Sequence, residues 1–489
     1  MRGLQLRQRW VRVRGRLGVA AAAALLLAFM PGCTLGPDYK RPEVKLPDYV
    51  IPPREAADIA GLHWWTLPGD AELLKLIQIA LGSNLTLKAA ASRVDVARSG
   101  VMVVQSNLYP HADYGTGVIR THKPGRYQRS FETVIAPQPS VSWTLDVWGR
   151  VRRQVESADA IAAGAEEGRR AAVLMIVSEV AEAYVRLRAA ETQYKITQDS
   201  ITRLSHDLDA MSSSTPPASE VARAQLFSSI ERYRANLPLL SATADQAEND
   251  LRLLCADPTL KISRGRGFAG LKTPVMPHTI RSDVLLRRPD VAQAEQRLIA
   301  ANAQIGAEMA LYLPQIHLSA SGGIGYSSLF PGPMPGGLTP VWALAGNAVG
   351  PLFAAGAITG KVDIAKGETE VALAEYQETL LTAFRDTKNA LIAYHRSTKH
   401  LEALIRSQNA LESAVAKTQD MLGKTPHEYT GLILLHNELY QAQIESALAR
   451  KGAFDAVVNI YKATGGGWVD EAAVYAPQPK PPLQRVPIL

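Results

Sequence analysis

Residues 142–154 read SWTLDVWGRVRRQ, and this stretch decides the fold. From Val141 to Val147 apolar and polar side chains alternate, which predicts a strand with one apolar face and one polar face. At Gly149 the alternation stops, and from Val151 to about residue 211 the sequence keeps helical spacing without a proline. A helix of that length spans roughly 90 Å at ~1.5 Å per residue, whereas helices in compact domains average ~11–12 residues. The stretch therefore predicts a short strand that leads into a very tall helix.

The same order of elements is predicted twice along the chain. Arg93 and Pro110 match Arg297 and Pro314 at an offset of 204, while Gly149 matches Gly356 at an offset of 207. Each copy has a helix, a proline, two strands, a glycine, a long helix, a break and a returning helix. The strands are predicted at about 112–122, 139–147, 315–327 and 340–352, and the long helices at about 149–211, 218–254, 356–422 and 429–463.

These elements divide the chain into five predicted segments. They are a signal peptide (1–32), an N-terminal tether (33–68), a first repeat (69–270), a second repeat (271–464) and an extended tail (465–489). Before the first strands, Asp70 and Asn84 are predicted N-caps of two helices. The first of these helices is expected to bury a stripe of Leu73, Leu74, Ile77 and Ala80.

The positive charge of the chain belongs to its first residues. The formal net charge is +7, from 53 basic and 46 acidic residues. Residues 1–32 hold six arginines and no acid, so the remainder has 47 basic and 46 acidic residues. That balance gives no support for nucleic-acid binding. The composition, with 47% hydrophobic and 6% aromatic residues, suits long packed helices better than a sheet-rich core.

The arginine-rich start is followed by the apolar run Leu17–Met30 and by Gly32-Cys33, which together resemble a secretory signal. Two interpretations remain open. In one, this is a lipoprotein signal, and Cys33 is acylated and becomes the new N-terminus. In the other, the chain is cut near Gly32 and Cys33 is an ordinary residue. If Cys33 is lipidated, Cys255 has no disulfide partner and is expected to be a small packed residue near a helix end.

The predicted strand 315–327 alternates over its whole length. Ile316, Leu318 and Ile324 lie on one face, and His317 and Ser319 lie on the other. One face suits lipid and the other suits water, as in a transmembrane barrel strand. Four strands per chain are too few to close a barrel, because the smallest membrane barrels have ~8 strands. Several copies must therefore combine, and three copies would give twelve strands.

Six groups of residues, in this order, resemble the outer-membrane factors of tripartite efflux and secretion systems, the TolC-like family, and its NodT-type lipoprotein branch. The resemblance covers essentially all of the mature chain. The groups are residues 36–42 (GPDYKRP), Trp64-Trp65 with Asp70 and Leu73, Asn84-Leu85, residues 143–150 (WTLDVWGR), Arg287-Arg288-Pro289-Asp290 with Ala294-Glu295, and residues 461–468 (YKATGGGW).

The resemblance implies a mainly α chain with a small membrane β part. In this family three identical chains form a 12-stranded outer-membrane β-barrel continued by a periplasmic α-helical barrel. It implies a passive duct that exports small molecules, such as drugs or toxic organic compounds, across the outer membrane of a Gram-negative bacterium. The implied partners are a periplasmic membrane-fusion adaptor, an inner-membrane pump and outer-membrane lipid, without nucleic acid. No cofactor is implied beyond the covalent lipid on Cys33.

The resemblance also marks candidate residues at the periplasmic tip. The matching positions of the family's constriction are Thr430, Leu434 and Asn437, where the usual carboxylate and guanidinium are both missing. The adaptor-docking candidates are the turn residues, which lack the family's Gly-Leu-Thr/Ser signature: Thr215, Pro216, Pro217, Thr425, Pro426 and His427. His427 and His436 lie near this tip, and two interpretations are open: a pH-sensitive constriction, and, as the favoured one, solvated loop and helix-face residues.

No enzymatic site is predicted from the sequence. There is no nucleophile elbow, no paired acid and base, and no spacing that indicates a metal site. Gly322, Gly323 and Gly325 lie inside a predicted strand, so they do not form a phosphate loop, and Pro289-Asp290 is expected to open a helix. Two alternatives to an efflux duct remain: a structural coiled-coil envelope lipoprotein without a pore, and a type I secretion duct for polypeptides.

Overall fold

The computed structural model describes residues 34–44, 70–124, 129–213, 220–263, 268, 282–327, 338–421, 428–465 and 469–481. Cys33, Trp64-Trp65 and the two predicted tip turns lie outside these residues. The chain divides into two compact units, and each takes segments from both predicted repeats. The first unit contains residues 1–40, 99–160 and 299–371, and the second contains 41–98, 161–298 and 372–489.

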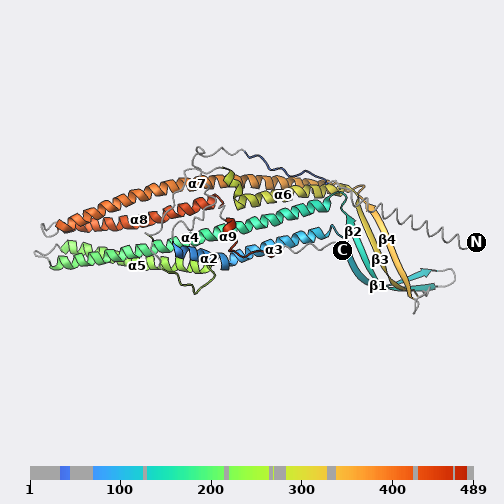
Figure 1. Ribbon diagram of the computed structural model, residues 1–489, viewed down its shortest axis with the longest axis horizontal. Coiled ribbons are helices and arrows are strands. Elements are labelled where there is room, and N and C mark those ends of the chain that lie inside the picture. The colour runs from blue at the N-terminus through green and yellow to red at the C-terminus, as the bar shows by residue number, and fades with distance from the viewer. Residues whose placement is uncertain are drawn as a thin grey trace, which may run out of the picture. The chain divides into compact units, whose positions relative to one another are not determined.

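The first unit contains one four-stranded antiparallel sheet (Figure 1). The strands are β1 (His111–Pro124), β2 (Arg129–Leu145), β3 (Gln315–Ser327) and β4 (Leu338–Val349). Their order in space follows their order in sequence, so β1 and β4 form the two edges. The predicted strand 315–327 coincides with β3.

Several strand boundaries differ from the sequence prediction, most of all the start of β2 and the end of β4. β2 begins at Arg129, ten residues before the predicted start, because it pairs with β1 from Pro124↔Arg129 onward. Pro137 and Pro139 lack an N–H, which argues against a strand in the sequence. Both lie between Ile135↔Tyr326 and Ser140↔Ser321, where no β2–β3 pair forms. β4 ends at Val349 rather than 352, because residues 350–352 have no partner strand in the described part of the chain.

The strand-to-helix junction is built by the side chain of Asp146. Its two carboxylate oxygens accept hydrogen bonds from the backbone N–H groups of Val151 (2.9 Å) and Arg152 (3.0 Å). A carboxylate at a helix start satisfies donors that lack an intrahelical partner. β2 therefore ends at Leu145, two residues before the predicted end. Gly149 supplies the positive φ of the turn (76°), and the helix begins directly after it.

The long helices run in the predicted order. They are α4 (Arg150–Ser213), α5 (Glu220–Leu254), α7 (Ala357–Met421) and α8 (Glu428–Ala463). Each strand pair is preceded by a shorter helix, α3 (Leu85–Ser106) or α6 (Pro289–Met309), and α6 opens at Pro289 as expected. Two short 3₁₀ helices flank α6 at Ser282–Arg287 and Ala310–Tyr312.

The core of the second unit is formed where α2 (Ala71–Ser83) and α9 (Val469–Ala473) pack on the middle of α4 and the end of α8. Asp70 caps α2 as predicted, because its Oδ1 accepts from the N–H of Glu72 at 2.9 Å. Asn84 caps α3 in the same way through the N–H of Thr86. The buried stripe of α2 differs at one position, because Leu74 is only half-buried. It consists of Leu73, Leu76, Ile77, Ala80 and Leu81.

Cys255 follows the last residue of α5 and is fully buried in this core, as the sequence predicted for a packed residue near a helix end. Burial, with a smaller contribution from Asp257, raises the pKa of its thiol to about 11. The thiol is therefore protonated and unreactive at neutral pH. None of the described helices has a stretch apolar enough to span a bilayer.

Candidate functional site

The sheet has two chemically different faces. In one cross-strand row, Val141 lies opposite Ala320, and Ala320 lies opposite Leu344. The same face holds Tyr114 and Trp342, which are 94% and 80% exposed. Exposed apolar side chains gathered on one face indicate a surface that meets lipid or another protein.

The opposite face of the sheet is polar. Its rows bring Thr144, His317 and Asn347 together, and Ser142 beside Ser319. The Thr144 hydroxyl and His317 Nδ1 are 2.9 Å apart. This face suits water, while the apolar face does not. The outer edges of β1 and β4 pair with no strand in the described part of the chain.

The residues that follow Cys33 are held against the start of α4. Arg153, with a side chain only 5% exposed, donates to the Leu35 carbonyl (3.0 Å) and to the Asp38 carboxylate (2.7 Å). Burial lowers the pKa of Arg153, but the hydrogen bonds to Asp38 and Glu156 outweigh this effect and raise it. These contacts form an N-terminal seat, defined as residues 34–38 on Arg153 and Gly306.

Gly306 makes this seat narrow. The N-terminal segment crosses α6 at Gly36, whose φ is +89°, and a Cβ on Gly36 would lie 2.5 Å from the Cα of Gly306. A Cβ on Gly306 would collide with the Leu35 carbonyl oxygen. Two backbones approach this closely only where both residues are glycine. The Asn302 side chain also donates to the Pro37 carbonyl at 2.9 Å.

The three predicted constriction residues lie on the first turns of α8. Leu434 is 60% exposed. Asn437 is half-buried and links two helices, because its Oδ1 accepts from the Tyr233 hydroxyl at 2.6 Å. Thr430 lies within α8, but its side chain is outside the described part. The six predicted docking residues of the turns are also outside it.

His436 differs from its prediction as a solvated residue. It is 5% exposed, and its Nε2 lies 3.2 Å from the Asp207 carboxylate on α4. The next residue of α8, Asn437, and Tyr440 one turn further on both contact Tyr233 of α5. The rings of Tyr233 and Tyr440 stack with centroids 3.9 Å apart. The prediction was wrong because the first hairpin, α4 and α5, packs on this face of α8.

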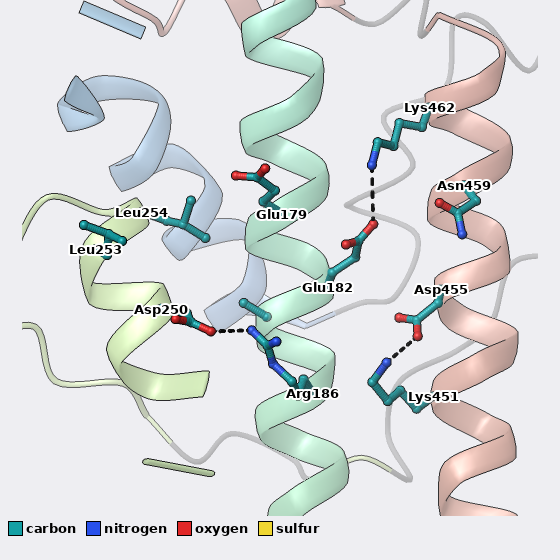
Figure 2. A pocket seen from close by; sticks show the side chains of 11 residues that line it. Glu179, Glu182, Arg186, Asp250, Leu253, Leu254, Lys451, Asp455, Asn459 and Lys462 are labelled. Carbon is teal, nitrogen blue, oxygen red and sulfur yellow. Dashed lines mark hydrogen bonds and ion pairs between the residues drawn. The ribbon is translucent and has the colours of Figure 1, made fainter. Parts of the chain in front are cut away.

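A cavity with mixed charges lies between the middle of α4, the end of α5 and α8 (Figure 2). Its volume is about 610 Å³. Figure 2 shows Glu179, Glu182 and Arg186 on α4, with Glu182 directed to Lys462 of α8 and Arg186 directed to Asp250 of α5. The sequence interpretation did not include this cavity, although the three-and-four spacing of these charged residues on α4 is a signal for a shared polar face.

Comparison with known proteins places this arrangement in a family. The sequence profile described as "Outer membrane efflux protein" matches residues 76–256 and 280–466. The chain belongs to the outer membrane efflux protein family. This family and its fold consist of channel proteins rather than known enzymes. The family assignment agrees with the resemblance carried by the six sequence groups.

Individual relatives align over almost the whole chain. A protein of Pseudomonas putida named "Probable efflux pump outer membrane protein TtgC" is 29% identical, over 92% of this chain and 95% of its own. The outer membrane protein OprJ of Pseudomonas aeruginosa is 27% identical, over 91% and 95%. The open-state structure of the MtrE outer membrane channel of Neisseria gonorrhoeae has a TM-score of 0.80 at 27% identity, over 89% and 98%. The CmeC outer membrane channel of Campylobacter jejuni shares the fold, with a TM-score of 0.79 at 20% identity over 91% and 99%.

Proposed function

We propose that this protein is the outer-membrane channel of a tripartite efflux system, a passive trimeric duct that exports small molecules from the periplasm. The observation that carries this proposal is the sheet, which is apolar on one face, polar on the other and open at both edges. Closing such a sheet removes its edges, places the apolar face in lipid and leaves a water-filled interior. The relatives named as toluene and antibiotic efflux proteins suggest organic solvents and drugs as the exported class.

The internal repeat of the chain predicts how strands of neighbouring copies pair. The registers His111↔Ser142 and Gln315↔Val349 relate β1 to β3 by 204 residues and β2 to β4 by 207 residues. Within one chain, Val141 of β2 lies opposite Ala320 of β3. Adding 207 to the position of Val141 gives Ala348 of β4, and subtracting 204 from the position of Ala320 gives Thr116 of β1. We therefore expect Ala348 to lie opposite Thr116 of a second copy.

The end of β4 supports this joint. β2 continues past its last β1 partner through Trp143, Thr144 and Leu145, which pair only with β3. Their counterparts in the second repeat are residues 350–352, beyond the end of β4. Leu352 and Phe353 are 105% and 88% exposed in the single chain. A neighbouring β1 would pair with residues 350–352 and cover these two side chains.

Three copies of four strands give a barrel of twelve, and the helices of each copy would continue it as an α-helical barrel. A covalent lipid on Cys33 fits this arrangement, because the N-terminal seat places residue 34 beside Gly149, at the junction of sheet and helix. The lipid would then tether the chain at the membrane surface. A periplasmic adaptor and an inner-membrane pump would complete the system, and the pump would supply the energy.

Leu434→Asp is expected to lower the single-channel conductance of the purified protein in a planar bilayer. The variant restores a carboxylate near the proposed constriction, where it can accept hydrogen bonds from neighbouring copies. Leu434 is 60% exposed, so the charge does not enter a core. Leu434→Asn has the same size without the charge and serves as the matched control. Conductance of Leu434→Asp equal to or above wild type would contradict this role for residue 434.

The same recordings test the proposed function. A duct produces stepwise conductance increases for the wild-type protein, whereas a structural coiled-coil lipoprotein produces none. The absence of steps would therefore overturn the proposal. A type I secretion duct would also conduct, and it is distinguished by purifying the native complex and identifying whether its partners belong to a drug pump or to a polypeptide exporter.

A further inference from the structure

The cavity between α4, α5 and α8 has the size and position of a small-molecule site. Its volume of about 610 Å³ lies within the ~300–1,000 Å³ of typical ligand pockets. It opens on the face of α4 that holds Glu179, Glu182 and Arg186 (Figure 2). The opposite face of α4, at Val180 and Tyr184, is buried in the core that includes α2. The cavity borders that core at Ala183 and Leu254.

The charges of the cavity do not balance. Three cations and four carboxylates line it, and each cation is already paired: Arg186 with Asp250 at 2.6 Å, Lys462 with Glu182 at 3.9 Å, and Lys451 with Asp455. Among the described residues, the Glu179 carboxylate has no hydrogen bond or ion pair. An incoming anion would have to displace a carboxylate from a cation, whereas an incoming cation finds a free one.

Glu182 shows that the surroundings disfavour further negative charge. Burial raises the pKa of Glu182, and the charges of Asp455 and Glu179 raise it further, against the opposing effect of Lys462. A raised pKa means that ionising this carboxylate requires more free energy in the cavity than in water. A second cation near Glu179 and Glu182 would reduce that cost, because it would stabilise the ionised form.

Apolar groups complete the lining. Leu253, Leu254 and Ala183 line the cavity together with the charged side chains. Leu253 is 77% exposed, so a ligand that covered it would remove apolar surface from water. Glu179 and Glu182 on α4, together with the leucine side chains on α5, match a molecule that has a cationic group attached to an apolar body.

We propose that this cavity binds organic cations of drug size, with the ammonium group beside Glu179 and Glu182 and the apolar part against Leu253. The inference rests on the proposed function in one respect: a duct is what would bring such cations to the cavity. The binding itself is a property of one chain, because every residue that lines the cavity belongs to the second unit.

The test is equilibrium binding of ethidium, an organic cation, to the purified full-length protein in non-ionic detergent at low salt, followed by fluorescence anisotropy. Glu179→Gln is expected to weaken binding about fivefold, the effect of removing one charge at contact distance in a water-exposed site. Lys451→Gln removes a cation from the same cavity and is expected to strengthen binding. Glu445→Gln, an exposed residue of α8 that does not line the cavity, is the matched control and should leave the affinity unchanged.

An anionic dye of similar size, anilinonaphthalene sulfonate, provides the second arm. It is expected to bind more weakly than ethidium and to lose no affinity in Glu179→Gln. Equal ethidium affinity in Glu179→Gln and wild type would overturn the inference, as would an equal loss in Glu445→Gln. In either case, stepwise conductance of the wild-type protein would still support the proposed function as a duct.

Discussion

Arg188→Ala is expected to loosen the junction where α2 and the segment after α5 meet α4. The Arg188 side chain is 1% exposed, and its guanidinium donates to Glu191 (2.7 Å) and to the Ser263 carbonyl. It also lies 4.7 Å from the centre of the Tyr184 ring, while the Tyr184 hydroxyl donates to Asp70 at 2.7 Å. Removing the cation takes the guanidinium donor away from the Ser263 carbonyl and from the Glu191 carboxylate.

Because the Glu191 side chain is 29% exposed, the loss of these hydrogen bonds costs about 1–3 kcal/mol. Hydrogen exchange of residues 70–76 and 255–263 is therefore expected to become roughly 5- to 150-fold faster, because a tenfold change corresponds to about 1.4 kcal/mol. Arg186→Ala is the matched control two residues away. Its pair with Asp250 is about half exposed at both ends and contributes about 1 kcal/mol or less. Equal exchange in the two variants would show that Arg188 does not hold this junction.

Gly306→Ala is expected to displace residues 34–38 from the N-terminal seat. The added methyl group would collide with the Leu35 carbonyl oxygen and would lie 3.0 Å from the Arg153 Cγ and Nε atoms. Overfilling a packed contact costs about 1–3 kcal/mol, which corresponds to roughly 5- to 150-fold faster hydrogen exchange of the segment. Hydrogen exchange of residues 34–41, read by mass spectrometry, measures this loss.

Gly360→Ala is the control for the glycine-to-alanine change itself. Gly360 lies in α7, and a Cβ there would have no atom within 4 Å. Alanine favours helix over glycine by about 1 kcal/mol, so this variant should be slightly stabilised. If Gly306→Ala leaves residues 34–41 as protected as they are in Gly360→Ala, the narrow glycine crossing does not control the seat.

Local signals in the sequence were sufficient for the order of the elements. The alternation of residues 315–327 predicted β3 with its bounds, and the side chains of Asp70 and Asn84 predicted two helix starts. These features depend on neighbouring residues, so a single sequence contains them. The spacing of Arg93 and Pro110 from Arg297 and Pro314 likewise gave the offset of 204 that relates β1 to β3.

Features that depend on distant contacts could not be predicted in this way. His436 is covered by the first hairpin, and Asp207 lies more than two hundred positions away in sequence. The residues that line the charged cavity come from three helices, and Glu182 meets Lys462 only after those helices pack. The early end of β4 has the same cause, because strand pairing depends on a partner and not on the strand alone.

The most direct test of the account is a cysteine cross-link between β4 of one copy and β1 of the next. Opposed residues on antiparallel strands have Cα atoms ~4.5–5.5 Å apart, within the range that a disulfide bridges. Thr116→Cys combined with Ala348→Cys is expected to oxidise into a covalent trimer on a denaturing gel, while the buried Cys255 stays reduced. Ala112→Cys with Ala348→Cys is four residues out of register and should remain monomeric. Monomers from both pairs, or equal cross-linking of both, would contradict the closure of this sheet by identical copies.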